Sequence, residues 1–225
     1  MKLKKLSIAC GLVLAGLSSV ASAESGFSGN VALTSDYIFR GLTQNDGDAA
    51  IQGGFDYAHD SGFYAGVWAS NVSEASYTDS SMELDLYLGW GGDFNGLAVD
   101  VGVLHYEYPG TSVDANNTDE YHVGVGYDFG AAAVSATYNY SPDFYGADEA
   151  TYLDLGIEVP VGPVTIAAHY GMTDYDAAAG DDYDDWSVGV STEYGGFGFD
   201  LSYYETDGVS GGDDDALVFT ISKSL

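Results

Sequence analysis

The stretch Met82-Glu83-Leu84-Asp85-Leu86-Tyr87-Leu88-Gly89-Trp90, MELDLYLGW in one-letter code, alternates apolar and polar side chains. Its even positions are all apolar, whereas its odd positions include Glu83, Asp85 and Tyr87. Successive side chains of a β-strand point to opposite faces, so this pattern predicts a strand with one apolar and one polar face.

The same period of two recurs along most of the chain. It predicts about twelve strands, most of them near 10 residues long, which is the length that a tilted strand needs to cross a bilayer. The first expected strand runs from Phe27 to Phe39, and the weakest is Phe63 to Val72, where both faces are fairly apolar. The other alternating segments are 51–57, 97–103, 121–129, 134–140, 153–159, 164–172, 186–194, 197–203 and 217–221.

The connections between these segments also alternate, between short and long. Short turns are expected at residues 60–61, 91–96, 130, 160–163 and 195–196, and longer polar stretches at 41–48, 71–80, 109–119, 141–149, 173–185 and 206–215. Outer-membrane barrels have short periplasmic turns and long outer loops. The sequence therefore predicts an all-β fold, a closed antiparallel transmembrane β-barrel of about twelve strands with acidic outer loops.

The N-terminus has the three parts of a signal peptide. Lys2, Lys4 and Lys5 precede the short apolar segment Leu6 to Leu17, and Ala21-Ser22-Ala23 fits a cleavage site. The apolar segment is shorter than the roughly 20 residues of a membrane-spanning helix. We expect residues 1–23 to be removed and residues 24–225 to form one barrel domain, exported through the periplasm to the outer membrane.

Composition excludes several classes of function. Loss of the three lysines would lower the formal net charge from −30 to −33 and leave Arg40 and Lys223 as the only basic residues. Such a chain is not expected to bind nucleic acid, which requires basic patches. The single cysteine, Cys10, lies in the expected signal peptide, so no disulfide framework is expected. At 14% aromatic residues the chain is too rich in rings for a disordered acidic segment.

A soluble β-sandwich is the alternative fold, because its strands would alternate as well. Two features favour the membrane barrel. Charges on the apolar face occur only near strand ends, as Glu107, Glu205 and Lys223, where the cost of a charge against lipid is small. Bulky aromatic residues also gather near strand ends, as in the two interfacial girdles of membrane barrels. They are Tyr37, Phe39, Tyr57, Trp90, Phe129, Tyr140, Tyr170, Trp186, Tyr194 and Phe197.

Two short runs resemble a known family. The N-terminal SGNVALTSDYIFRGLTQND and the C-terminal VFTISKSL are similar to the ends of the TorF-type porin family of small proteobacterial outer-membrane proteins. The best-matching part is Ser35 to Gln44, with its Asp-Tyr-x-Phe-Arg-Gly core. The resemblance implies an outer-membrane barrel of the porin class. The chain departs from the usual barrel ending, because it closes on Leu225 rather than on an aromatic residue.

Arg40 shares its parity with Asp36, so both side chains are expected to point into the barrel near the outer end of the first strand. Arg40 could place a charge at a pore constriction, or it could brace the barrel wall by pairing with carboxylates, which Arg binds bidentately. Because an inward charge must be paired or hydrated, bracing is the favoured interpretation.

The remaining candidate lumen residues share the polar parity of their strands. In a water-filled lumen they would attract cations and repel anions. This predicts a porin-like channel for passive diffusion of small hydrophilic solutes, with cations preferred; the alternative is a non-conducting structural or surface-interaction barrel with a filled lumen. These residues are Asp56, Glu83, Asp85, Asp100, Asp128, Asp154, Glu158, Glu193 and Asp200.

No other chemistry is indicated. The acidic loop DYDAAAGDDYDD lacks the spacing of an EF-hand, so solvated loops are expected rather than a calcium site. His122 and His169 have lumen parity, but no catalytic signature accompanies them, and we predict neither an enzyme nor a cofactor. The expected partners are the outer-membrane lipid bilayer and small solutes or cations, and the sequence leaves the oligomeric state open.

Overall fold

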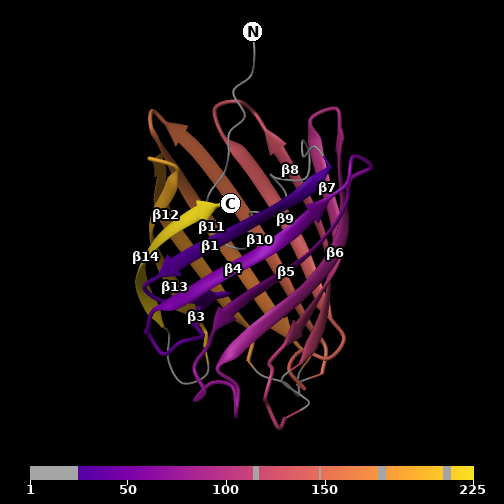
Figure 1. Cartoon of the computed structure of the whole chain (residues 1–225), viewed down its shortest axis with the longest axis vertical. Coiled ribbons are helices and arrows are strands. Elements are labelled where there is room, and N and C mark those ends of the chain that lie inside the picture. Colours follow the sequence, from indigo (N-terminus) through magenta and orange to yellow (C-terminus); the bar gives the residue numbers. More distant parts are fainter. Residues whose placement is uncertain (1–24, 114–116, 147, 177–180, 210–213) are drawn as a thin grey trace.

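A computed structural model of the chain describes residues 25–113, 117–146, 148–176, 181–209 and 214–225. In this part of the chain twelve antiparallel strands close into a barrel, and β2 and β3 form a separate two-stranded hairpin (Figure 1). The signal peptide expected at residues 1–23 lies outside the described residues. The barrel strands are β1 (Gly26–Thr34), β4 (Ala50–Ala58), β5 (Phe63–Asn71), β6 (Met82–Phe94), β7 (Leu97–Glu107), β8 (Thr118–Asp128), β9 (Ala133–Ser141), β10 (Ala150–Val161), β11 (Val164–Tyr175), β12 (Tyr183–Tyr194), β13 (Phe197–Asp207) and β14 (Asp215–Ser224).

Pairing between strands that follow one another in the chain forms the wall of the barrel, and pairing between the first and last strands closes it. Each strand pairs with the next one along the chain, and β1 pairs with both β4 and β14. Closure leaves no unpaired sheet edge, which is what a sheet in contact with hydrocarbon requires. The predicted closed barrel of about twelve strands is confirmed.

The two faces of the wall differ as the sequence pattern predicts. In β6, Leu86 and Leu88 are 49% and 58% exposed on the outside, whereas Glu83 and Asp85 are 2% and 6% exposed on the inside. An apolar outer face around a polar interior is the reverse of a soluble protein and suits a wall with lipid outside. Among the described residues, no helix is long and apolar enough to span a membrane.

Connections at the two ends of the barrel differ in length. The end at which β1 begins and β14 ends has the short turns, and we call it the short-turn end; the opposite end is the long-loop end. Several strands continue further than the sequence suggested. The turn expected at residues 91–96 shrinks to Asn95-Gly96, because β6 runs to Phe94, and both turn residues have positive φ, as tight hairpins require.

The first strand is shorter than predicted. β1 ends at Thr34 instead of continuing to Phe39, and the Thr34 hydroxyl donates a hydrogen bond of 2.7 Å to the carbonyl of Asp36. The chain then forms the hairpin of β2 (Ile38–Phe39) and β3 (Leu42–Thr43). Between them Arg40 and Gly41 have φ values of 49° and 80°, which is the two-residue turn with positive φ at both positions.

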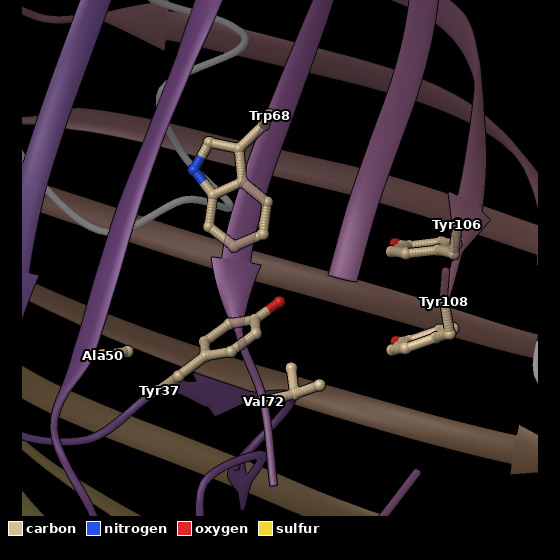
Figure 2. Packing of buried hydrophobic residues seen from close by; sticks show 6 residues of the cluster. All are labelled: Tyr37, Ala50, Trp68, Val72, Tyr106 and Tyr108. Carbon is tan, nitrogen blue, oxygen red and sulfur yellow. The ribbon is translucent and has the colours of Figure 1, made fainter. Parts of the chain in front are cut away.

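This hairpin segment is packed among side chains of the inner wall. Figure 2 shows the cluster of buried residues, in which the ring of Tyr37 lies beside Trp68 of β5 and above Val72. The centroids of Tyr37 and Trp68 are 5.5 Å apart in an edge-on arrangement. Trp68 is 6% exposed, which places it inside and settles the parity of β5, the one strand whose faces the sequence left unassigned.

Candidate functional site: an acidic lumen crossed by a hairpin

Arg40, the only arginine, sits at the tip of the hairpin and reaches across the barrel. Its Nη2 lies 2.5 Å from Oε2 of Glu120 on β8, which is nearly opposite β1 in the strand order, and each side chain is 5% exposed. The guanidinium carbon lies 4.8 Å, 5.3 Å and 4.2 Å from the ring centroids of Phe39, Phe144 and Tyr152. Burial opposes the charge, but Glu120 more than compensates and holds the pKa of Arg40 above its usual value.

The backbone of the hairpin tip is also held. The hydroxyl of Tyr183 donates a hydrogen bond of 3.1 Å to the carbonyl of Arg40. Gly41 packs so closely against Asp185 and Thr206 that an added Cβ would lie 2.7 Å from the Cβ of Asp185. Glycine therefore meets two needs here, a positive φ and a close approach to the wall.

Glu83 on β6 fixes the residue just before the hairpin to the same half of the wall that carries Glu120. Its Oε1 accepts a hydrogen bond of 2.9 Å from Tyr37, and its Oε2 accepts one of 2.9 Å from Tyr108. Burial is the main reason that the pKa of the Tyr37 hydroxyl rises well above its usual value, so this hydroxyl keeps the proton that it donates. With the bond from Tyr183 of β12, these contacts tie one short segment to strands on both sides of β1 in the strand order.

Two histidines bind lumen carboxylates. His122 Nε2 lies 2.5 Å from Oδ1 of Asp100, which also accepts a hydrogen bond of 2.9 Å from Tyr64. His169 bridges two acids, with Nδ1 3.2 Å from Asp154 and Nε2 2.7 Å from Asp185. These contacts give three of the inner carboxylates a histidine partner on a neighbouring strand.

Asp36 lies at the base of the hairpin and accepts a hydrogen bond of 2.7 Å from the hydroxyl of Thr43. Burial raises the pKa of Asp36; the bond from Thr43 opposes that change, and nearby Asp46 and Asp48 add to it. Beside it, a cavity of about 410 Å³ lies between the hairpin segment and the start of β14.

The candidate lumen residues fall into two groups along the barrel. Glu83, Asp85 and Asp154 lie near the long-loop end and are buried, as are Asp36 and Arg40 of the hairpin segment. The other six lie within four residues of the short-turn end, on alternating inner positions: Asp100 and Glu158 are buried, Asp56 and Asp200 are half-buried, and Asp128 and Glu193 are exposed at the rim.

The structure corrects the sequence analysis at the hairpin. Tyr37 and Phe39 were expected on the outer apolar face as part of an aromatic girdle, but Tyr37 is 5% exposed and Phe39 contacts the inner residue Tyr106, with ring centroids 5.8 Å apart. Arg40 and Asp36 lie beyond the first strand rather than in its wall. The reason is the turn at Arg40-Gly41, which reverses the chain inside the barrel.

Two important acids were missed. Glu120, the partner of Arg40, shares the inner parity of His122, and this parity could have identified it. Asp185 was assigned to a solvated loop, yet it is 1% exposed, because β12 begins at Tyr183. In the described segments, no group of metal-ligating residues lies close enough together to hold an ion.

Comparison with known proteins defines the class of fold. The chain is similar to the KdgM porin, at 8% identity and a TM-score of 0.59 over 88% of this chain and 98% of that one. It is also similar to the NanC porin, at 10% identity and a TM-score of 0.55 over 88% and 98% of the two chains. A further neighbour is the KdgM porin in complex with disordered oligogalacturonate, at 7% identity and a TM-score of 0.59 over 88% and 97%. The fold is that of the small outer-membrane porins.

The family follows from the sequence match. The model of a bacterial protein family of unknown function, Gcw_chp, matches residues 19–223, and the chain belongs to this family. No curated protein matches the chain. The TorF-type name attached to the resemblance of the two chain ends stays a prediction.

Proposed function

We propose that the protein is a porin-like channel in the outer membrane that lets small hydrophilic solutes diffuse through its lumen, with cations preferred. The observation that carries this proposal is the inner wall, where carboxylates extend from the long-loop end to the short-turn end behind an apolar outer face. The one arginine is already paired with Glu120, so it contributes little net positive charge. Catalysis and a cofactor have no part in this proposal.

The sign of the wall charge supports the preference for cations. Carboxylates in a narrow, low-dielectric passage set a negative potential that concentrates cations and excludes anions. One neighbour of the same fold is described in complex with oligogalacturonate, which is a polyanion. We expect this chain to exclude such a solute, because its inner wall carries the same sign of charge.

The hairpin favours a second candidate, a structural or surface-interaction barrel with a filled lumen. Tyr37 and Arg40 are 5% and 7% exposed and hold the segment across the interior. If the hairpin blocks every path, the barrel conducts nothing and its role lies in the envelope or in its loops. Small barrels are often filled by their own side chains.

Planar bilayers separate the two candidates. Purified mature protein should give stepwise conductance in potassium chloride, and a salt gradient should give a reversal potential of the sign expected for potassium. The filled barrel would instead be supported if the wild type gave no conductance and a variant with residues 37–43 replaced by a short glycine linker did conduct. An anion-selective reversal potential would reject the proposed preference. Sequencing the N-terminus of the exported protein would test the expected start at Glu24.

A further inference from the structure

Six carboxylates form a ring inside the short-turn end of the barrel. They come from β4, β7, β8, β10, β12 and β13, and each lies within four residues of a short turn. Most are already engaged. Tyr87 donates to Asp56, Tyr64 and His122 contact Asp100, and Ser202 donates to Asp200. Asp128 accepts a hydrogen bond of 2.6 Å from the backbone of Gly130 with one oxygen.

Glu158 differs from Asp100, the other buried member of the ring, because Asp100 keeps hydrogen bonds on Oδ1 while its Oδ2 lacks a partner, whereas no contact to a polar group holds either oxygen of Glu158 among the described residues. It is 6% exposed on the inner face of β10, and its Oε2 has no hydrogen-bond partner among the described residues. A buried carboxylate oxygen without a partner costs free energy, so such a group in a native protein calls for an explanation. The two directly opposite positions cannot supply a donor, because Glu158 pairs with Ala133 on one side and with Ala167 on the other.

The register places a second carboxylate at a useful distance. Ala133 of β9 pairs with Glu158 on one side and with Asp128 on the other, so the two acids flank one alanine. Neighbouring strands lie about 4.8 Å apart, which separates the two backbone positions by about 10 Å. The side chain between the two carboxylates, that of Ala133, is small and apolar.

The spacing of the two carboxylates and the alanine between them favour one class of cation over others. A bare metal ion needs several oxygen or nitrogen ligands around one point, and no such group occurs in the described residues. An ammonium group needs only one carboxylate, to which it donates charge-assisted hydrogen bonds. A linear polyamine offers two or more ammonium groups joined by methylenes, which can lie along the alanine surface and reach both acids.

We infer that the short-turn end of the lumen contains a binding site for linear polyamines, centred on Glu158 and completed by Asp128. This deepens the proposed function by naming a class of cationic solute, and it rests on the acidic lumen proposed there. Binding does not require an open pore, so it can be measured apart from conductance.

Isothermal titration of spermidine into the refolded mature barrel in a zwitterionic detergent tests this site. Saturable binding is expected for the wild type, with a dissociation constant that rises about tenfold in Glu158→Gln, the size of one charge-assisted contact. Asp128→Asn, at the exposed strand end, should also weaken binding. Glu205→Gln removes the same charge from the outer face and should change the constant less than twofold.

The results that would overturn the site are specific. Absence of saturable binding to the wild type rejects it, and so does equal binding by Glu158→Gln and Glu205→Gln, because that would show only a general attraction to the acidic surface. Folding of each variant is checked by the heat-dependent shift of the barrel in gel electrophoresis. If Glu158→Gln does not fold, unchanged binding by Asp128→Asn rejects the two-carboxylate site. Loss of conductance with intact spermidine binding would contradict the channel and leave this inference standing.

Discussion

The contact between Arg40 and Glu120 gives the sharpest prediction, because it joins the hairpin tip to the far wall. In Arg40→Gln the amide can no longer neutralise Glu120, whose side chain is 5% exposed. The change also removes the guanidinium from between the rings of Phe39, Phe144 and Tyr152. The barrel hydrogen bonds are untouched, so the cost falls on the docking of the hairpin.

The size of the effect follows from burial. Removing one partner of a buried ion pair costs about 3–5 kcal/mol, because the other charge stays desolvated and unpaired. Since about 1.4 kcal/mol changes an equilibrium constant tenfold, the ratio of docked to undocked hairpin should fall at least about a hundredfold. Glu120→Gln should have a similar effect, and the double variant should lose less than the sum of the two, because it leaves neither charge alone.

Hydrogen exchange measures this docking directly. The amide of Gln44 donates a hydrogen bond of 2.7 Å to the carbonyl of Tyr37 within the hairpin, so its exchange reports opening of this segment. In Arg40→Gln the amides of residues 37–44 should exchange about a hundredfold faster, while those of the barrel strands are unchanged. Lys223→Gln removes the one lysine of the described residues, which lies on the outer face near Phe197, and should leave the hairpin protected. Equal protection of the hairpin in the wild type and Arg40→Gln would refute the reasoning.

Three further predictions concern the outer face, the hairpin base and the inner wall. Leu86→Arg places a charge against lipid at a mid-strand position that is 49% exposed, and should lower the free energy of unfolding in vesicles by about 2–4 kcal/mol; an unchanged value would contradict a lipid-facing Leu86. Burial raises the pKa of Asp36, so its contribution to hairpin docking is present below the ordinary value of 3.8 and is lost as pH rises through the raised value. In the wild type, protection of the hairpin amides should therefore fall between pH 4 and pH 7, and in Asp36→Asn it should fall less. The measurement is hydrogen exchange corrected for intrinsic rates, and an identical pH profile in both proteins would contradict the prediction. Asp56→Asn with Asp200→Asn should move the reversal potential in a potassium chloride gradient toward zero, whereas no shift would show that the inner acids do not set selectivity.

Much of the barrel was predictable because lipid on one side and a polar interior on the other impose a period of two on every strand. The alternation of Leu86 and Leu88 with Glu83 and Asp85 results from this difference between the two sides of the wall. Strand ends were less predictable, because the wall extends beyond the apolar band into turns and loops. This is why β6 continues through two glycines to Phe94 and why Asp185 lies in a strand rather than in a solvated loop.

The hairpin was not predictable from the pattern. The residues from Ser35 to Arg40 continue the alternation of β1, and the interior of a small barrel accepts aromatic and charged side chains that a wall could also carry. The residues next to Tyr37 in the sequence do not determine whether its side chain points out of the barrel or into it. Its contacts with Trp68 and Glu83 hold it inside, and these residues lie 31 and 46 positions further along the chain. The Arg-Gly pair, suited to a tight turn, was the one local signal.

The three tryptophans provide the most direct test of a wall with lipid outside and a polar lumen inside. Trp90 and Trp186 lie on the outer apolar face, whereas Trp68 is 6% exposed on the inner face. In variants that keep one tryptophan and replace the other two with phenylalanine, the protein is refolded into vesicles that contain lipids with brominated acyl chains. The account predicts strong quenching of the fluorescence of Trp90 and Trp186 and little quenching of Trp68. Equal quenching of all three, or quenching of Trp68 alone, would contradict it.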